Sequence, residues 1–336
     1  MTRIAVLGSG AWGTALALAL APRHQVTLWS HRPEHARDLA LSRENRHFLP
    51  GFALPPSIKI TGDDTAISDA DILVSVIPSQ FLRPTIARLA PNISARQILV
   101  SATKGIEDTT YLRMTQVIRE SLIRQTLPVS LPIGALSGPS FAQEVAQGQP
   151  TAITIAFAQP NLAARIQREF SSPTLRLYTT DDLIGVEMGG ALKNVIAIAA
   201  GVASGLGLGA NSSAALITRG IAEITRLAVA SGAQPETLSG LSGIGDLILT
   251  CSGALSRNRT VGQKLGQGQK LPEILASLNG KVAEGISTTR AALGLARKLN
   301  VEMPITQQMQ QILDQNKDPK SAIKELMQRP TRDEAD

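Results

Sequence analysis

Short apolar runs alternate with segments of helical spacing in the first half of the chain. We expect the apolar runs to form strands, and they are Ile4–Leu7, Val26–Trp29, Ile72–Ile77, Ile98–Ala102, Ile133–Leu136, Ala152–Ala158 and Leu175–Tyr178. Strands separated by helices are typical of βαβ units, whose strands pair in a largely parallel sheet. The pattern therefore predicts an α/β fold for this part of the chain.

The pattern changes near residue 183, after which long runs of helical period follow one another. These runs cover roughly residues 184–203, 212–231, 256–267, 284–299 and 303–314, and the sequence between them is not typical of strands. We therefore expect two domains: an α/β domain over residues 1–182 and an all-helical domain over residues 183–336. The polar tail from Gln328 is expected to be frayed.

The composition is that of an ordinary globular protein. With 336 residues, of which 43% are apolar and 18% charged, the chain is long enough for two hydrophobic cores. Its net charge of +6 suits an anionic small molecule. Aromatic residues make up only 3% of the chain and the basic residues are scattered, so we expect no nucleic-acid partner.

The scarcity of cysteine and histidine narrows the chemistry. A single cysteine, Cys251, cannot form an internal disulfide, and all four histidines lie within the first 47 residues. We therefore expect no metal site, because zinc-dependent dehydrogenases need a Cys/His ligand set. A histidine acid–base group in the second half is also excluded. Neither Tyr111 nor Tyr178 has a lysine four residues later, which argues against a Tyr-Lys reductase.

Two apolar stretches are too short to span a membrane. Residues 11–21 and 195–210 fall below the roughly 20 residues that a spanning helix needs, and the second stretch carries four glycines. The N-terminus has one basic residue, Arg3, and leads directly into the first apolar run. We therefore expect no integral membrane segment and a cytoplasmic location.

A glycine motif follows the first predicted strand. The segment Gly8–Gly13 has the pattern G-x-G-x-x-G and opens an apolar helix expected over Thr14–Ala21. In this context the first glycine makes the turn, the second lets a pyrophosphate approach the backbone, and the third lets helix and strand pack closely. The motif predicts a Rossmann-type dinucleotide site that includes Gly8, Gly10, Ala11, Trp12 and Gly13.

The second predicted strand ends in polar and basic residues. An NAD site usually has an acid there to hold the ribose 2′-hydroxyl, whereas this chain has Ser30, His31 and Arg32 and no acid between Gly13 and Glu34. Because basic side chains suit a 2′-phosphate, we expect NADP(H) to be the preferred cofactor, with NAD(H) as the alternative. An ordinary solvated loop would also explain Arg32.

One lysine stands alone in the most apolar stretch. Lys193 lies in Gly189–Ile198, and no other charged residue occurs between Glu187 and Arg219. Removal from water lowers the pKa of an ammonium group and prepares it for proton transfer. Together with a hydride-carrying cofactor, such a lysine indicates a carbonyl reductase. A lysine that snorkels out of a helix would show the same local pattern.

Motifs spread along nearly the whole chain carry a family resemblance. The segments are Gly8–Ala17, Ala102–Gly105, Ser137–Ala142, Gly190–Asn194, Gly243–Leu247, Ser256–Arg259, Val282–Gly285 and Met303–Ile305. In content and order they resemble the soluble NAD(P)-dependent glycerol-3-phosphate dehydrogenases of bacterial type. One departure is Ser204, because the family generally has an acidic residue before the following glycine.

The resemblance implies roles for residues in the matching segments. Lys193 would donate the proton to the developing alkoxide, and Lys104 would polarise the carbonyl. Asp246 would pair with Lys193, with Thr250 one turn later, although Asp246 could instead cap a helix. Arg257 and Asn258 would bind the substrate phosphate; a helix cap with solvated arginines is the alternative.

The implied sites overlap. The cofactor site would comprise Gly8, Gly10, Ala11, Trp12, Gly13, His31, Arg32, Phe48, Lys104, Ala142, Arg257, Val282 and Glu284. The substrate site would comprise Lys104, Gly138, Ser140, Lys193, Asn194, Asp246, Thr250, Ser256, Arg257 and Asn258. Some of these residues have simpler explanations, since a lone Glu before Gly, such as Glu284, is usually a helix terminus.

The resemblance also implies a reaction. NADPH, or alternatively NADH, would reduce dihydroxyacetone phosphate to sn-glycerol 3-phosphate for phospholipid synthesis, in a homodimer. One rival is another two-domain dehydrogenase with a helical lysine, such as the β-hydroxyacid type, against which the phosphate-directed segment Ser256–Arg259 argues. Another rival is a protein that senses NADP(H) without turnover, against which Lys104, Lys193 and Asp246 argue.

Overall fold

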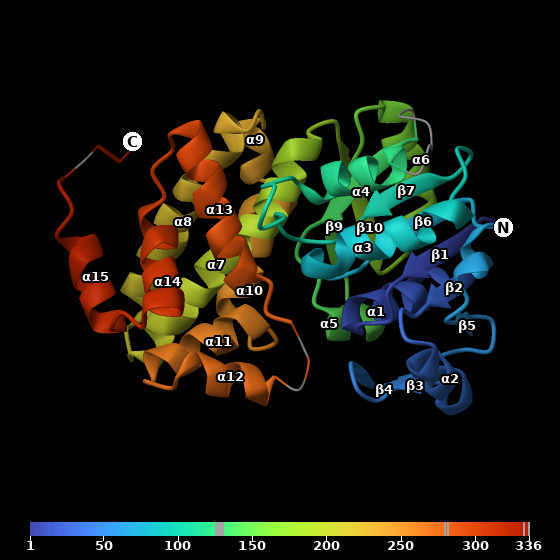
Figure 1. The fold of residues 1–336 in the computed structure, drawn as a ribbon, viewed down its shortest axis with the longest axis horizontal. Helices are drawn as coiled ribbons and strands as arrows, with labels where there is room; N and C mark the ends of the chain where they lie inside the picture. Colours follow the sequence, from blue (N-terminus) through green and yellow to red (C-terminus); the bar gives the residue numbers. More distant parts are fainter. Residues whose placement is uncertain (125–130, 279, 281, 332, 335–336) are drawn as a thin grey trace.

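The computed structural model describes residues 1–124, 131–278, 280, 282–331 and 333–334. The molecule is elongated: a helix-covered sheet forms one half and a bundle of helices forms the other (Figure 1). The strands end with β10 (Leu175–Thr180) and the helical half begins with α7 (Leu183–Gly205). The α/β fold with an all-helical C-terminal part is thereby confirmed.

An eight-stranded sheet organises the N-terminal half, in the order β10-β9-β8-β7-β6-β1-β2-β5. Neighbouring strands are parallel except β8 and β9. The remaining strands of the sheet are β1 (Arg3–Leu7), β2 (Gln25–Trp29), β5 (Lys59–Thr61), β6 (Ile72–Ser75), β7 (Ile98–Ser101), β8 (Ile133–Ser137) and β9 (Thr151–Ala156). All seven strands expected from the apolar runs are present, within a few residues at their ends.

Strand β5 and the separate hairpin of β3 (Glu44–Asn45) and β4 (Leu49–Ala53) were not expected from the sequence. They are short and largely polar or half-exposed, so they lack the apolar runs that reveal the other strands. Strand β5 pairs with β2 at one lateral edge of the sheet, whereas the hairpin is a separate sheet that lies next to α2 (Figure 1).

The sheet is buried on both faces, which explains its continuous apolar runs. In β1, Ile4 and Val6 belong to one hydrophobic cluster, whereas Ala5 and Leu7 belong to the cluster on the opposite face. The covering helices are α1 (Ala11–Leu20), α2 (Pro33–Ser42), α3 (Ser79–Leu89), α4 (Met114–Ile123) and α6 (Pro160–Phe170), with the 3₁₀ turns η1 (Asp64–Ile67) and η2 (Ala90–Asn92). The short helix α5 (Ala142–Ala146) packs on α1 and β4.

The carboxyl ends of the central strands are level. Leu7 pairs with both Trp29 and Ser75, and Ser75 pairs with Ser101. Chain order reverses at β1, which lies between β6 and β2. Ligands of open α/β sheets bind in the crevice outside such a reversal, so this edge is where the loops after β1, β6 and β7 can form a site.

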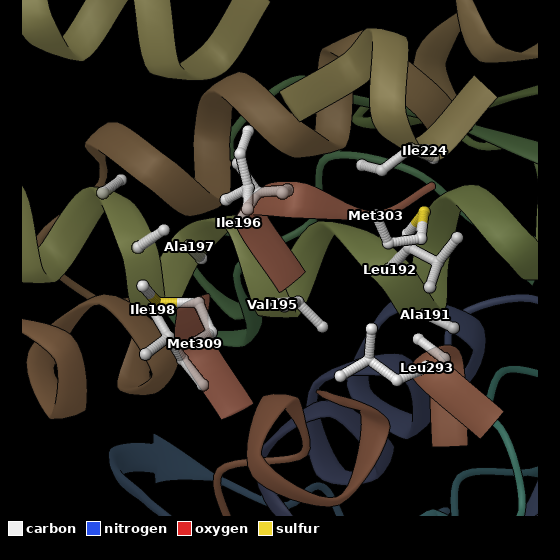
Figure 2. Packing of buried hydrophobic residues seen from close by; sticks show 14 of the residues in the cluster. Ala191, Leu192, Val195, Ile196, Ala197, Ile198, Ile224, Leu293, Met303 and Met309 are labelled. Atoms are coloured by element: carbon white, nitrogen blue, oxygen red, sulfur yellow. The ribbon is translucent and has the colours of Figure 1, made fainter. Parts of the chain in front are cut away.

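Helix α7 is the axis of the C-terminal half. Its neighbours are α8 (Ala210–Ala230), α9 (Pro235–Leu238), η3 (Leu241–Gly245), α10 (Asp246–Ser252), α11 (Arg257–Gly266), α13 (Gly285–Leu299) and α14 (Pro304–Gln315). Further out, α12 (Leu271–Ser277) packs on α11 and α15 (Pro319–Met327) packs on α14. Side chains such as Leu192, Val195 and Ile196 leave α7 in several directions and meet apolar residues of the surrounding helices (Figure 2). Because every side of α7 is covered, its sequence is apolar all round.

Close backbone approach lets α11 lie directly on α7. A Cβ on Gly201 would lie 2.0 Å from the carbonyl oxygen of Arg259, and one on Gly262 would lie 1.9 Å from that of Ile198. Helix α7 is long and apolar enough to cross a membrane, and it is the one single helix of which this is true among the described residues. However, 89% of its most apolar stretch is buried within the protein. Its hydrophobicity is therefore explained by its place in the core.

Candidate active site

The glycine motif forms an open turn between β1 and α1. Gly8 has φ +124°, and a Cβ there would lie 2.8 Å from the carbonyl oxygen of Val76. A Cβ on Gly13 would lie 1.9 Å from the carbonyl oxygen of Gly8, whereas Gly10 faces open space. The first turn of α1 has no side-chain cap and no acidic residue, so its N–H groups can bind phosphate. These residues fit a dinucleotide.

The three polar residues at the end of β2, which the sequence suggests as a binding site for the 2′-phosphate, do not share one environment. Ser30 is buried and shares a 2.9 Å hydrogen bond with the Ser9 hydroxyl, whereas His31 and Arg32 are exposed. Arg88 from α3 lies 3.4 Å from His31 Nδ1 and stacks over the Trp29 ring at 5.1 Å.

An acid does lie beside this strand end, although it comes from elsewhere in the chain. Asp64 of η1 accepts hydrogen bonds from Trp29 Nε1 at 3.2 Å and from Arg88 at 2.9 Å. The residues that directly follow β2 in the sequence include neither Asp64 nor Arg88, so neither was predicted. The local signal could not reveal them, since β5 and η1 bring Asp64 to this strand end from a later part of the chain.

The hairpin of β3 and β4 carries Phe48 beside the glycine loop. The half-buried Phe48 ring makes edge contacts with His35 and His47, at centroid distances of 5.6 and 4.4 Å. Asn45 ties the hairpin to the loop, because its amide donates to the Ser9 carbonyl at 2.9 Å and to Thr14 Oγ1 at 2.7 Å. Phe48 therefore lies at the edge of the loop that fits a dinucleotide.

Two lysines from different halves of the molecule share one carboxylate. Lys193 on α7 donates to Asp246 Oδ1, and Lys104, just beyond β7, donates to Asp246 Oδ2 at 2.5 Å. Lys193 also donates to Thr250 Oγ1 at 2.8 Å, and Lys104 to the Gly138 carbonyl at 3.3 Å. The sequence-predicted trio of Lys193, Lys104 and Asp246 is thus brought together.

The cluster is largely shielded from water. Lys193 is 6% exposed and Asp246 is 1% exposed. Burial, assisted by the positive charge of Lys104, outweighs the attraction of Asp246 and lowers the pKa of Lys193 to about 7. Burial alone would raise the pKa of Asp246, but the two ammonium groups outweigh it and lower that pKa. Lys193 can therefore gain or lose a proton near neutral pH while Asp246 stays charged.

An irregular helix places Asp246. The π-helical turn η3 precedes α10, and Asp246 is the first residue of α10. Such turns often occur at functional sites. The turn packs tightly against its neighbours, because a Cβ on Gly243 would lie 2.0 Å from the Leu238 carbonyl oxygen and one on Gly189 of α7 would lie 2.5 Å from that of Ser242. Asp246 contacts the lysines with its side chain and does not act as a side-chain cap.

The residues expected to bind phosphate gather at the start of α11. Ser256 caps this helix by accepting from the Arg259 N–H at 3.2 Å, and Arg257 is exposed at the first helical position. Asn258 donates to Asn194 Oδ1 at 2.9 Å and accepts from the Gly285 N–H at 3.0 Å. An arginine, the two amides and the helix N-terminus together can bind a dianionic phosphate next to Lys193.

The turn after β8 connects the cofactor loop with the lysine cluster. Trp12 Nε1 donates to the Ser140 carbonyl at 3.1 Å and to Ser140 Oγ at 3.2 Å, and Ser140 donates to the Gly138 carbonyl at 3.1 Å. Gly138 is also the residue that Lys104 contacts. Ala142 begins α5 and belongs to a small hydrophobic cluster with residues of α1.

Glu284 bridges the two halves. Its carboxylate accepts from the hydroxyl of Ser79 at 2.5 Å and from the Ser79 N–H at 3.3 Å, at the start of α3. Burial raises the pKa of Glu284 to about 7, against the opposing effect of these hydrogen bonds and of Arg257. Ser79 was missed by sequence reasoning, because a serine after a proline carries no signal of a partner 205 residues away. Val282 lies half-buried two residues before Glu284.

The remaining reactive groups do not add chemistry. Within the described residues, no group of three or more His, Cys, Asp or Glu side chains could hold a metal ion. Cys251 is buried, which raises its pKa to about 12 and keeps the thiol protonated. Ser204, the departure noted in the sequence, accepts from Arg259 at 3.4 Å at the far end of α7. None of these features disturbs the lysine cluster.

Comparison with known proteins gives matches over nearly the whole chain. The model of the NAD-dependent glycerol-3-phosphate dehydrogenase N-terminus matches residues 3–163, and that of its C-terminus matches residues 182–324. A protein of Acidobacterium capsulatum named glycerol-3-phosphate dehydrogenase (NAD(P)+) is 56% identical, covering 99% of this chain and 100% of its own length. One from Koribacter versatilis with the same name is 54% identical, covering 99% of each.

The structural comparison agrees. The crystal structure of glycerol-3-phosphate dehydrogenase from Coxiella burnetii superposes with a TM-score of 0.92 and 38% sequence identity, covering 98% of this chain and 99% of that one. The yeast enzyme GPD1 gives a TM-score of 0.81 at 28% identity, covering 96% and 98% of the two chains. Both halves of the fold are therefore shared with these enzymes.

Proposed function

This chain belongs to the NAD-dependent glycerol-3-phosphate dehydrogenase family, and from that premise we propose how its residues perform the reaction. It is an NAD(P)-dependent oxidoreductase that interconverts dihydroxyacetone phosphate and sn-glycerol 3-phosphate. The observation that carries the assignment of roles is the shared carboxylate of Asp246, which holds the ammonium groups of Lys193 and Lys104 at one point.

In the direction of reduction, the ketone carbon receives hydride and its oxygen receives a proton. The nicotinamide supplies the hydride when it is bound. Lys193 donates the proton to the developing alkoxide, because its pKa near 7 makes the ammonium a competent acid. Lys104 polarises the same carbonyl, and Asp246 fixes both ammonium groups while its charge remains. In the reverse direction the neutral Lys193 amine accepts the proton of the alcohol.

The binding residues follow from their positions around this cluster. Gly8–Gly13 hold the dinucleotide, with Ala142 beside the loop, Phe48, His31 and Arg32 at the adenosine end, and Val282 and Glu284 at the nicotinamide end. Arg257, Asn258, Ser256 and Asn194 bind the substrate phosphate, while Gly138, Ser140 and Thr250 line the reacting end. Burial of Lys193 keeps water from competing for its proton.

Further properties belong to the proposal. Residues 1–182 form the dinucleotide-binding domain and residues 183–336 the substrate domain, with the reaction at their junction. We expect a preference for NADP(H) over NAD(H), since His31, Arg32 and Arg88 can offset the charge of Asp64 at the end of β2. The enzyme would work in the cytoplasm as a homodimer, without nucleic acid, and its product would enter glycerophospholipid synthesis.

The test is a rate measurement. Purified protein is mixed with dihydroxyacetone phosphate and either NADPH or NADH, and the loss of absorbance of the reduced nicotinamide is followed. Rapid oxidation that disappears in Lys193→Ala, with the variant still folded and binding cofactor, is the expected result. Near-normal turnover by Lys193→Ala would refute the proton-transfer role. Cofactor binding without turnover by the unaltered chain would instead favour a sensor or another carbonyl substrate.

A further inference from the structure

A closed loop follows Lys104 and reaches from the sheet to the helical half. We call residues 105–113 the strap. An isolated bridge pairs Ile106 with Arg113, and within it Glu107 N–H donates to the Leu112 carbonyl at 3.0 Å and Tyr111 N–H to the Glu107 carbonyl at 2.9 Å. Because the strap begins at the residue after Lys104, its placement decides the point from which the Lys104 side chain extends.

One side of the strap is fixed to the sheet half. The Glu107 carboxylate accepts two hydrogen bonds from Arg83 of α3, at 2.8 and 2.7 Å, and a third from Thr110 at 2.5 Å. Arg83 also pairs with Glu120 of α4 at 3.1 Å. A bidentate, partly buried pair of this kind has a defined geometry, so this end of the strap moves with α3 and α4.

The other side is docked on the helical half. Ile106 is 2% exposed and belongs to the hydrophobic cluster centred on α7, and Tyr111 packs against the same cluster. Tyr111 lies over Gly294 of α13 so closely that a Cβ on Gly294 would be 2.2 Å from its ring atoms. The Lys298 ammonium lies 4.6 Å from the centre of the same ring, and the strap's last residue, Arg113, pairs with Glu187 of α7.

Two features of the strap's backbone depend on this docking. Tyr111 has φ +62°, a left-handed conformation that a non-glycine residue keeps only where its surroundings hold it. Gly105 has φ +156°, and a Cβ there would lie 2.6 Å from Cβ of Ser79 and 3.3 Å from the carboxylate of Glu284. The chain leaving Lys104 therefore passes through a narrow gap between the two halves.

We propose that Tyr111 is a positioning residue for the reaction: by docking the strap on α13, it holds the Lys104 ammonium against Asp246, beside Lys193. This inference rests on the proposed function. Among the described residues, no hydrogen bond or ion pair joins Tyr111 to Lys104 or to Asp246. Tyr111 therefore acts on Lys104 through the strap. Gly294 supports the same arrangement by leaving room for the ring.

The proposal has a consequence for proton transfer. The groups that face Lys193 are Asp246 and Thr250 from α10 and Lys104 from the base of the strap, while the neighbouring Cys251 stays neutral. The positive charge of Lys104 lowers the pKa of Lys193. A loosened strap lets Lys104 leave, so the pKa of Lys193 rises. Reduction needs protonated Lys193, and its rate should then persist to higher pH while its maximum falls.

The test is a double-mutant cycle between Tyr111 and Lys104. Tyr111→Ala is expected to lower kcat for dihydroxyacetone phosphate at least tenfold and to move the basic limb of the pH profile upward. Tyr111→Phe, which keeps the ring, should remain within twofold of the unaltered enzyme. In a Lys104→Met background, Tyr111→Ala should cost less than a further twofold, because the group it positions is gone.

Several results would overturn the proposal. They are an equal loss from Tyr111→Ala in both backgrounds, an unchanged pH profile, or full activity of Tyr111→Ala. If Tyr111→Ala does not fold, Gly294→Ala replaces it, because the added methyl group displaces the Tyr111 ring. This variant should show a smaller loss of kcat and a smaller upward shift of the basic limb. Full activity of Gly294→Ala with an unshifted pH profile would again overturn the proposal. Absence of activity in the unaltered enzyme would refute the proposed function itself, and so is distinguishable from failure of the strap.

Discussion

Replacing Asp246 by asparagine tests the electrostatics of the site most directly. Asp246→Asn keeps the shape of the side chain but removes the charge that two buried ammonium groups share. A charge pair about 4 Å apart contributes about 4 kcal/mol at an effective dielectric constant of about 20. This corresponds to roughly three pKa units, and rearrangement of side chains and water will reduce it. We therefore expect the pKa of Lys193 to fall by at least one unit.

The direction of the effect on the rate follows from the proton that Lys193 must donate. Reduction proceeds from the ammonium form, so its rate falls as pH rises through the pKa of Lys193, which is about 7 in the unaltered protein. A lower pKa moves this fall to lower pH. At pH 7.5 a fall of one unit from a pKa of about 7 lowers the protonated fraction of Lys193 about eightfold. The rate of Asp246→Asn should therefore fall at least about eightfold at pH 7.5 and partly recover toward pH 6.

The assay is the initial rate of NADPH oxidation with saturating dihydroxyacetone phosphate, measured from pH 5.5 to pH 9. Asp71→Asn is the matched control, because Asp71 pairs with Arg3 at the partly exposed far edge of the sheet. Removing a partner from a buried ion pair can cost roughly 3–5 kcal/mol of stability, so thermal unfolding and cofactor binding are measured on the same sample. A folded Asp246→Asn enzyme with the unaltered pH profile would refute the reasoning.

Three other substitutions test separate parts of the structure. Arg257→Ala should raise the KM for dihydroxyacetone phosphate about tenfold or more through loss of a charge-assisted hydrogen bond. Lys264→Ala on the same helix should leave the KM unchanged. An unchanged KM in Arg257→Ala would show that Arg257 does not bind the substrate phosphate. Arg32→Asp should shift the ratio of NADPH to NADH rates toward NADH, and a constant ratio would show that Arg32 does not read the 2′-phosphate. Gly262→Ala should destabilise the protein by about 1–3 kcal/mol in urea unfolding, because its Cβ would lie 1.9 Å from a carbonyl oxygen of α7. Gly209→Ala meets no atom within 4 Å and should cost less, about 0.5–1 kcal/mol, through loss of a favourable N-cap residue of α8.

The parts of the fold that could be predicted are those with a strong local period. The strands of the sheet are buried on both faces and α7 is buried all round, so their apolar runs are unmistakable. Strand β5 was not predicted because it is three residues long and half-exposed at the edge. Helix α15, with only Ala322 buried, likewise lacks a wide apolar face. Local pattern is informative only where burial is extensive.

The candidate site was predictable to the extent that each residue carried its own chemical signal. A lysine isolated in an apolar run and glycines after a strand are unusual wherever they occur. The Lys193–Asp246 contact, by contrast, joins residues 53 positions apart, and Lys104 reaches the same carboxylate from 142 positions away. The family resemblance suggested the first contact, while the shared use of one carboxylate by two lysines became visible only in the structure.

The residues that escaped prediction share a physical property: their partners lie on another part of the fold. Tyr111 is one of two tyrosines, and the sequence shows only that no lysine follows it four residues later, yet it occupies a left-handed backbone position against α13. No hydrophobic period marks such a residue, since its conformation is stable only when both halves have assembled. A site built at the junction of two halves needs such connecting contacts, because the lysines it brings together repel each other and neither half can hold them both.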